Sequence, residues 1–436
     1  MLAVADAFGL GSARRRRGVK ISDTAWDSVV VGAGVAGGVA AAMLAEQGRR
    51  VLLIEKSAWP REKVCGGCLN AAAVEVLREI GIGAALRRAE PIDSVVWHVG
   101  RRSLELAIPR EAAVSRADLD AAIVLEAKRR GCEFLSGFSA MLLPPVVGDS
   151  FRTLKLQRAD EAAIIRAGVV LACDGIGGTL LAGEPWARWH ISPGASMGVS
   201  GTCETCPDEI GRGAIHMHVG NKGYVGIVRM IGSRAHLAAS LDPAACRSAG
   251  GPLNLVREIL GASGKSLGAN LDSLRIRGTG ALTRHREHLG SNRVLAVGDA
   301  CGYVEPFTGE GMAWAAIGAR EVVKMLPAPD ESWPEDLPTR WRIRHHEIIG
   351  RRQRWCRGMQ PMMHHPAIAA AGILVGSAVP AIARWIAAAV CKPRQKEIFN
   401  DSPGRFRFQR DRTEISDGNT GDRDGDAGVH VAGGDT

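Results

Sequence analysis

At 436 residues, the chain exceeds the roughly 250–300 residues that a single hydrophobic core organises, so two joined domains are expected. Hydrophobic residues make up 46% of it and charged residues 23%, a composition that excludes an intrinsically disordered protein. The net charge of +9 would suit nucleic acid, but no RNA- or DNA-binding module accompanies the basic residues, so no nucleic-acid partner is expected.

Residues 1–26 form a basic N-terminal extension that contains four consecutive arginines at 14–17. This extension lacks the apolar segment of a secretory signal. The ten cysteines of the chain are scattered, as in proteins that keep free thiols in a reducing compartment. We therefore expect a cytoplasmic protein.

The run 28–48 predicts a short buried strand, a glycine turn and a helix. Gly32, Gly34 and Gly37 within it fit the G-x-G-x-x-G pattern of dinucleotide sites. The first glycine permits a tight turn, the second lets backbone amides approach a pyrophosphate, and the third lets the helix pack closely on the sheet. The N-terminus of the helix favours the phosphate charge.

A second buried strand at 51–55 completes a strand, helix and strand unit with a parallel sheet. The strand ends in Glu55, which is placed to accept hydrogen bonds from the ribose hydroxyls of the nucleotide. A glycine pattern alone is a weak signal. Because a strand, a helix and an acidic residue surround this one in the right order, we expect a dinucleotide site here.

The middle of the chain predicts a second layer of β-structure. Residues 95–110 alternate loosely like a pair of exposed strands, and residues 115–130 read as a helix capped by Ser115 or Asp118. Residues 190–285 are rich in glycine and in short β-like runs. We expect them to form a substrate sheet inserted between segments of the nucleotide domain.

The nucleotide domain returns with a strand at 293–297 and a helix at 311–326. Residues 334–400 read as a helical C-terminal region, within which 366–383 carries no charged side chain. Residues 401–436 are polar, aperiodic and rich in glycine and aspartate, so a disordered tail is expected there.

Two further segments carry a family resemblance. Residues 60–67 read PREKVCGG, and residues 293–314 read RVLAVGDACGYVEPFTGEGMAW, which places Gly298 and Asp299 between a strand and a glycine-punctuated loop. With the first glycine loop, these segments resemble geranylgeranyl reductase-like FAD-dependent oxidoreductases of the para-hydroxybenzoate hydroxylase superfamily. The resemblance covers residues 27–390 in motif order.

The resemblance implies how FAD is held. In that family, the aspartate that matches Asp299 bonds the ribityl chain, and the loop that matches 306–311 lies against the isoalloxazine, where a helix N-terminus stabilises charge. The loop that matches 60–67 runs beside the flavin. Cys65 and Pro306 are thereby implied as residues that influence flavin reactivity. The implied cofactor-binding residues are Gly32, Gly34, Gly37, Glu55, Arg61, Cys65, Gly66, Gly67, Arg116, Asp174, Gly298, Asp299, Pro306, Gly309 and Gly311.

Two residues of this set, Asp174 and Arg116, have alternative interpretations that involve no cofactor. Asp174 and Gly175 match the middle Asp-Gly motif of the superfamily only in part, and an ordinary turn explains them as well. Arg116 matches an arginine that borders FAD, and the alternative is a surface position on a helix.

Two C-x-x-C pairs, Cys65 with Cys68 and Cys203 with Cys206, raise the question of a four-cysteine zinc site. The pairs lie far apart in the sequence, and the flavin loop already accounts for the first, so no metal is expected. A redox-active dithiol at the first pair is an alternative, although the thioredoxin-like context is missing.

The expected function is reduction of a double bond in a hydrophobic isoprenoid- or polyketide-like substrate by hydride from reduced FAD. One alternative is an FAD- and NAD(P)H-dependent monooxygenase that hydroxylates an aromatic or polyketide substrate. Another is a membrane-peripheral FAD-binding scaffold or sensor without turnover. Residues 224–229 lack the tryptophan and proline of the aromatic motif in isoprenoid-reducing members, so the substrate stays open.

The electron donor is expected to bind transiently. Only one glycine pattern has a strand–turn–helix context, so no dedicated NAD(P)H domain is visible, and NAD(P)H or another reductant must visit the flavin site. The basic run 340–357 and the uncharged segment 366–383 suggest peripheral contact with the cytoplasmic face of a membrane rather than a span. The sequence leaves the oligomeric state open.

The expected fold class is α/β, with a Rossmann-like FAD-binding domain, an inserted mixed β-sheet substrate domain and C-terminal helices. In chain order, the expected segments are the basic extension 1–26, FAD-binding segment one 27–94, substrate-domain strands 95–110, FAD-binding segment two 111–189, the substrate sheet 190–285, FAD-binding segment three 286–333, the helical region 334–400 and the tail 401–436.

Overall fold

The computed structural model describes residues 25–381, apart from 147, 208–209, 233, 265–273, 306–308 and 380. The chain divides into two compact units, residues 1–394 and 395–436, and every described residue belongs to the first. The tail expected at 401–436, nearly all of the basic extension, and Pro306 lie outside the described residues.

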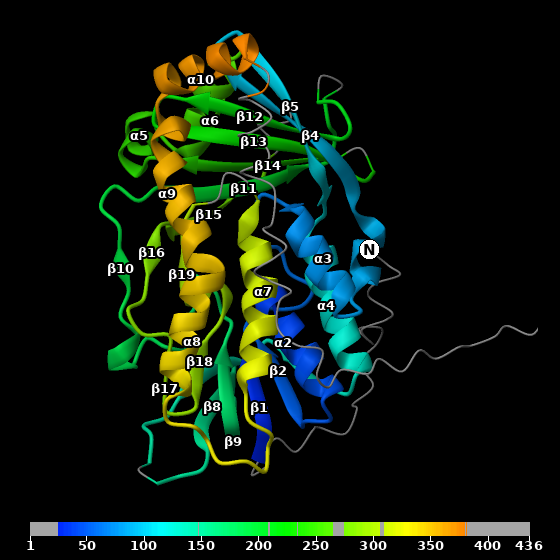
Figure 1. The fold of residues 1–436 in the computed structure, drawn as a ribbon, viewed down its shortest axis with the longest axis vertical. Coiled ribbons are helices and arrows are strands. Elements are labelled where there is room, and N and C mark those ends of the chain that lie inside the picture. The colour runs from blue at the N-terminus through cyan, green and yellow to red at the C-terminus, as the bar shows by residue number, and fades with distance from the viewer. Residues whose placement is uncertain are drawn as a thin grey trace, which may run out of the picture. The chain divides into compact units, whose positions relative to one another are not determined.

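The first sheet, drawn in the lower half of Figure 1, has a parallel core. Its core strands run β18-β9-β1-β2-β6, all parallel, as the strand–helix–strand pattern predicts. The antiparallel strands β7, β8 and β17 extend it. The strands are β1 (Ala25–Val31), β2 (Val51–Glu55), β6 (Glu133–Ser136), β7 (Ser139–Leu142), β8 (Arg152–Arg158), β9 (Glu161–Ala172), β17 (Gly290–Ser291) and β18 (Val294–Ala296).

Helices pack against this sheet and against one another. The helix α2 (Val35–Glu46) buries almost every side chain, because it contacts β1 and β2 as well as α4 (Arg116–Arg129) and α7 (Glu310–Met325). Of the two predicted caps of α4, Ser115 is the N-cap, since its hydroxyl accepts a hydrogen bond from the Asp118 amide. This part of the chain also contains the helix α3 (Ala71–Glu79) and the short 3₁₀ turns η1 (Gly83–Arg88), η2 (Pro185–Ala187) and η4 (Gly298–Ala300).

The second sheet gathers strands from three separate parts of the chain in the order β15-β11-β14-β13-β12-β4-β5-β3. Its strands are β3 (Cys68–Leu69), β4 (Glu90–Val99), β5 (Arg102–Ala113), β11 (Met197–Cys203), β12 (Ala214–Gly220), β13 (Gly223–Met230), β14 (Arg234–Leu241) and β15 (Arg277–Ala281). The helices α5 (Pro243–Ser248) and α6 (Pro252–Ala262) follow β14. Strands β11–β15 of this sheet fall within 190–285, and β3, β4 and β5 come from earlier in the chain. Together, β4 and β5 start earlier and end later than 95–110, because buried Ile92 and Ala113 continue the pairing.

A small third sheet and the last helices complete the described chain. The third sheet is β10 (His190–Ile191), β16 (Arg284–His285) and β19 (Gly302–Tyr303). The C-terminal helices are α8 (Leu337–His345), the π-helical turn η5 (His346–Gly350), α9 (Arg351–His364) and α10 (Pro366–Ala378). Among the described residues, no helix is long and apolar enough to cross a bilayer.

The C-terminal helices link the two sheets (Figure 1). The helix α8 contacts α7, α9 contacts β12 and β13, and α10 packs on β4 and β5. Part of the basic run 340–357 serves this packing: Arg344 pairs with Glu321 at 2.8 Å, and Arg352 pairs with Glu310. These two arginines face carboxylates of α7 rather than an outer surface.

Candidate functional site

One cavity of about 700 Å³ is lined by residues of both large sheets and of the loops between them. The glycine turn after β1 lies at one part of its wall, and strands β11–β14 supply another. A cavity that joins a parallel sheet at the carboxyl ends of its strands with a second sheet is the usual place for a dinucleotide and its substrate.

The three glycines of the first turn have different roles in this structure. Gly32 has φ +103° and Gly37 has no room for a side chain, because a Cβ atom there would lie 1.8 Å from the Gly32 carbonyl oxygen. Both are therefore needed for the fold itself. Gly34 borders the cavity, and a Cβ atom there would meet only the ends of two arginine side chains, at 3.4 and 3.6 Å. Its missing side chain leaves open the space in front of the α2 N-terminus.

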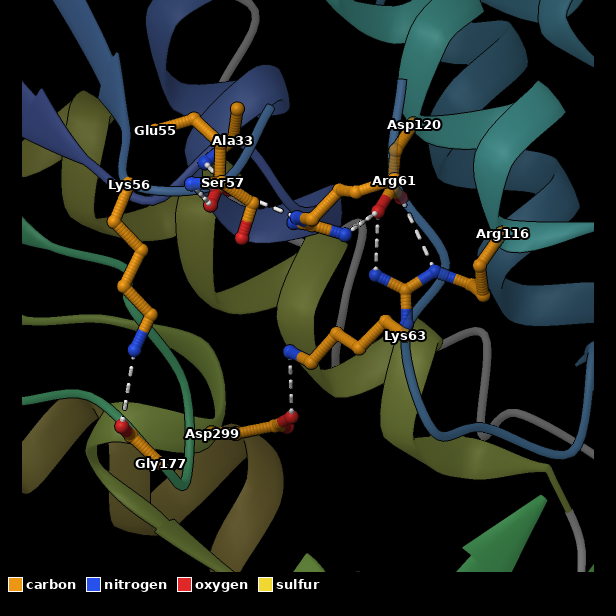
Figure 2. Close-up of polar contacts among 10 residues, drawn as sticks. All are labelled: Ala33, Glu55, Lys56, Ser57, Arg61, Lys63, Arg116, Asp120, Gly177 and Asp299. Carbon is orange, nitrogen blue, oxygen red and sulfur yellow. Dashed lines mark hydrogen bonds and ion pairs between the residues drawn. The ribbon is translucent and has the colours of Figure 1, made fainter. Parts of the chain in front are cut away.

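Glu55 holds the edge of this space (Figure 2). Its Oε2 accepts hydrogen bonds from the Ala33 amide at 3.2 Å and from Arg61 Nε at 2.9 Å, and its Oε1 accepts one from the Ser57 amide at 3.0 Å. Burial alone would raise the pKa of Glu55, but the Arg61 charge and these amides more than offset it and hold the pKa below its usual range. A carboxylate accepts about four hydrogen bonds, so Oε1 keeps capacity for one more donor, such as a ribose hydroxyl.

Two arginines flank Gly34. Arg61 Nη1 and Arg116 Nη2 both bind Asp120 Oδ2, at 3.0 and 2.8 Å, and Arg116 Nε binds Asp120 Oδ1 at 3.1 Å (Figure 2). Although burial opposes its charge, Asp120 keeps the pKa of Arg116 above its usual range. The structure thus places Arg116 in the buried site rather than on a helix surface. Asp120 and Glu55 balance the two guanidinium charges. The Nη2 atoms of both arginines still lie within 3.6 Å of a Cβ position at Gly34, beside the helix N-terminus, where they can donate hydrogen bonds to a pyrophosphate.

Asp299 and the loop after β9 lie on the next stretch of the wall. Lys63 Nζ lies 3.6 Å from Asp299 Oδ2. Asp174 turns inward and accepts a hydrogen bond from the Leu180 amide at 2.9 Å, and burial raises its pKa. The Asp174 carboxylate therefore fixes the turn that follows β9, whereas Asp299 offers its carboxylate to the cavity.

The loop that contains Cys65 is tied to the second sheet. The Cys65 amide donates to Ser200 Oγ at 3.3 Å, and its carbonyl oxygen accepts from His236 Nε2 at 2.7 Å. Gly67 has φ +71° and packs against Met230 and His236. Burial raises the pKa of the Cys68 thiol well above its usual range, so this thiol stays protonated. No cluster of three or more metal-ligating side chains occurs in the part of the chain that the structure describes.

Most of the sequence-predicted site residues meet at the cavity wall. Those that line it are Gly32, Gly34, Glu55, Arg61, Cys65, Gly66, Arg116, Asp174, Asp299, Gly309 and Gly311. Gly37, Gly67 and Gly298 lie behind the wall and shape it: Gly298 has φ +65°, and a Cβ atom there would lie 2.8 Å from Ala36 Cβ. Pro306 lies outside the described residues.

Sequence reasoning missed other residues of the wall, among them Lys63, Tyr224 and Glu305. It also missed Asp120, which binds both arginines. The spacing of Arg116 and Asp120 by four positions on a helix was a usable signal, because it pairs opposite charges on one face. No local pattern marks Tyr224 or Glu305, since their role in the site comes from segments that pack together only in the fold.

The arrangement fits the dinucleotide that the glycine turn predicts. The phosphates of FAD match the open helix N-terminus at Gly34 and the two arginines beside it. The hydroxyls of FAD match two carboxylates, Glu55 with its spare accepting capacity and Asp299. The fit rests on shape and charge complementarity of the side chains themselves.

Comparison with known proteins gives consistent results. The profile of the family described as FAD binding domain matches residues 25–331. Menaquinone reductase of Mycobacterium tuberculosis is 28% identical over 355 residues, which are 74% of this chain and 82% of that protein. Conditioned medium factor receptor 1 of Dictyostelium discoideum is 25% identical over 349 residues, 68% of this chain but only 62% of that protein. A flavoprotein/dehydrogenase from Cytophaga hutchinsonii shares the fold, with a TM-score of 0.70 at 16% identity over 84% of this chain and 93% of that one.

Proposed function

The chain belongs to the FAD binding domain family of FAD-dependent oxidoreductases, and from that premise we propose that it reduces a double bond of an apolar, isoprenoid- or polyketide-like substrate. The geranylgeranyl reductase-like motifs at 60–67 and 293–314 support this narrower assignment. So does the similarity to menaquinone reductase, which extends over most of that protein.

The observation that carries the proposal is the wall that the second sheet presents to the cavity. Its cavity-facing side chains are mostly apolar or small, and besides Tyr224 and Ser240 it offers few groups that would hydrogen-bond a polar substrate. The apolar residues are Ile215, Met217, Val228 and Leu282, and the small ones include Gly198, Gly226, Ala238 and Gly278.

The residues around the carboxyl ends of the first sheet would hold the cofactor. Glu55 would accept from the ribose, Arg61 and Arg116 would bind the pyrophosphate at the α2 N-terminus, and Asp299 would accept from the ribityl chain. When it is bound and reduced, FAD supplies the hydride. The protein positions the substrate against that group and excludes water by means of the apolar wall. Transiently bound NAD(P)H or another reductant is the proposed source of electrons.

We also propose that the protein works in the cytoplasm at the cytoplasmic face of a membrane. The helix α10 turns Ala369 and Ile373 toward the second sheet, whereas Ile368, Leu374 and Val375 are about half exposed. Exposed Arg101 and Arg102 lie in the β4–β5 segment on which α10 packs. An apolar helix face beside cationic side chains suits a surface of anionic lipid, from which an apolar substrate can be taken up.

An anaerobic titration tests the reductase proposal. The full-length protein is loaded with FAD, reduced chemically without dioxygen, and mixed with isoprenoid quinones, polyprenyl compounds and polyketides in turn. We expect the flavin absorbance to return on mixing with an apolar compound although dioxygen is absent. If the flavin absorbance returns only when dioxygen is admitted together with an aromatic or polyketide compound, the protein is a monooxygenase and not a reductase. A protein that no donor reduces would favour a scaffold without turnover.

A further inference from the structure

A connected group of polar side chains leads from the cavity to the outer helix α9. Tyr224 of β13 and Glu305, which follows β19, both line the cavity, and Glu305 is only 3% exposed. His364 is the last residue of α9, and its side chain is 15% exposed. A buried carboxylate thus stands between a phenol in the cavity and an imidazole with access to solvent.

The contacts within this group are close. His364 Nε2 lies 3.1 Å from Glu305 Oε1, and Gln360 Nε2 donates to Glu305 Oε2 at 3.1 Å. Tyr224 packs edge-on against the His364 ring, with 5.9 Å between ring centroids. Both oxygens of the carboxylate are therefore engaged, and the imidazole lies against both the carboxylate and the phenol ring.

The charges are arranged for proton exchange. Burial would raise the pKa of Glu305, but His364 more than offsets it, so the pKa lies below its usual range and the carboxylate is ionised. Burial, followed by the Glu305 charge, raises the pKa of Tyr224, so the phenol keeps its proton. The other titratable groups that face the pair are Tyr303 of β19 and Cys356 of α9, whose pKa values are also raised.

We propose that Tyr224 exchanges a proton with the substrate and that Glu305 and His364 conduct this proton between the phenol and solvent. The inference rests on the proposed reduction, because adding hydride to a double bond requires one proton as well. In the step, the Tyr224 O–H bond breaks as the new C–H bond of the product forms. The phenolate then recovers a proton from His364 through Glu305, and His364 takes one from water, so the protein returns to its starting state.

The alternative for the same contacts is purely structural: Glu305 would clamp α9 to the segment that precedes the glycine loop. A structural clamp needs hydrogen bonds but no titration. His364→Gln separates the two cases, because an amide still donates to Glu305 but does not carry a mobile proton. His365→Gln is the matched control, since the same substitution is made one position away at an exposed side chain.

The first arm of the test does not depend on catalysis. The chain has two tyrosines, so Tyr303→Phe leaves Tyr224 as the single site for a carbon-13 label at Cζ. In the full-length protein without substrate, we expect the Tyr224 resonance to move with pH, because protons join and leave the connected side chains. This movement should vanish on adding His364→Gln and persist on adding His365→Gln. If the resonance does not move, or moves equally in both variants, Tyr224 does not exchange protons with His364 and the proposal is wrong.

The second arm uses single-turnover reduction of a substrate found by the anaerobic titration. Tyr224→Phe should slow it by about a hundredfold or more, the usual contribution of a positioned acid. His364→Gln should slow this single turnover less than Tyr224→Phe does, and it should change the pH profile of the reaction. Tyr224→Phe turning over as fast as the wild type would refute the proton role. If no apolar substrate is reduced at all, the proposed function fails, and the resonance arm alone decides whether the side chains are coupled.

Discussion

At the scale of single residues, Gly34 and Gly37 separate binding from folding. Gly34→Val should fold, because its backbone is in the extended region at φ −83° and its Cβ atom would meet only flexible arginine ends. It should nevertheless lose most of its FAD, since the branched side chain occupies the space in front of the α2 N-terminus. Gly37→Val should fail to fold. The check is the ratio of flavin to protein absorbance, together with circular dichroism.

A control glycine exists for this comparison. Gly261 in α6 has an ordinary φ and no atom within 4 Å of a Cβ position, so Gly261→Ala should keep both fold and FAD. If folded Gly34→Val binds FAD fully, the glycine turn does not form part of the FAD site.

Glu111 makes stability depend on pH. Burial, followed by the nearby Glu310, raises the pKa of Glu111 to about 8. A raised carboxyl pKa contributes stability that is fully present below the unfolded value, roughly 4.3, and that is lost as the pH rises through the folded value near 8. Glu111→Gln stays neutral, so it should be the more stable protein at pH 8, by an amount on the order of a few kcal/mol, and not at pH 4.

Thermal unfolding from pH 4 to pH 9 checks this expectation. Glu105→Gln, on an exposed position of the same strand, is the matched control and should follow the wild type throughout. If the unfolding temperatures of Glu111→Gln and the wild type change with pH in the same way, the buried Glu111 carboxylate does not cause the pH dependence of stability.

Some site residues could be predicted from the sequence and others could not. Gly32, Gly34 and Glu55 follow from a local pattern with a physical reason at each position, and Arg116 from a family resemblance. Glu305 and His364 are 59 positions apart and meet only because α9 returns to the second sheet. Such a contact has no local signature, so the sequence alone does not reveal it.

At the scale of elements, the strands and helices around the glycine turn were predictable because buried parallel strands are short apolar runs between turn residues. One of the short β-like runs expected within 190–285 is β13 (Gly223–Met230), and the predicted helix 311–326 is confirmed by α7 (Glu310–Met325). The partners of the basic run were not predictable. Its Arg344 and Arg352 bind carboxylates of α7, which the charge pattern of 340–357 alone does not indicate.

The outer face of α10 gives a prediction at this scale. Replacing Ile368, Leu374 and Val375 by serine should leave FAD content intact, because the buried face of the helix is unchanged. Co-sedimentation with anionic liposomes at low salt should fall, since the apolar contact with lipid is lost. Ile191→Ser, at another exposed apolar position, should bind as the wild type does. A wild type that ignores liposomes would end the proposal of a membrane surface.

At the scale of the whole molecule, the expected α/β class with a Rossmann-like domain is confirmed. The order of the second sheet could not be predicted, because it takes β3–β5 from before α4 and β11–β15 from far behind it. That mixing creates the cavity, whose lining combines charged residues beside the first sheet with strands of the second. In our proposal, the charged part holds the cofactor and the second sheet faces the substrate.

The central claim is that this cavity serves reduction rather than oxygenation. The most direct measurement is the mass of the product after one turnover of the reduced, FAD-loaded protein with its apolar substrate under isotopically labelled dioxygen. The account predicts a product that has gained two hydrogen atoms and no labelled oxygen, at a rate that dioxygen does not increase. A product that carries one labelled oxygen atom would contradict it and would make the protein a monooxygenase.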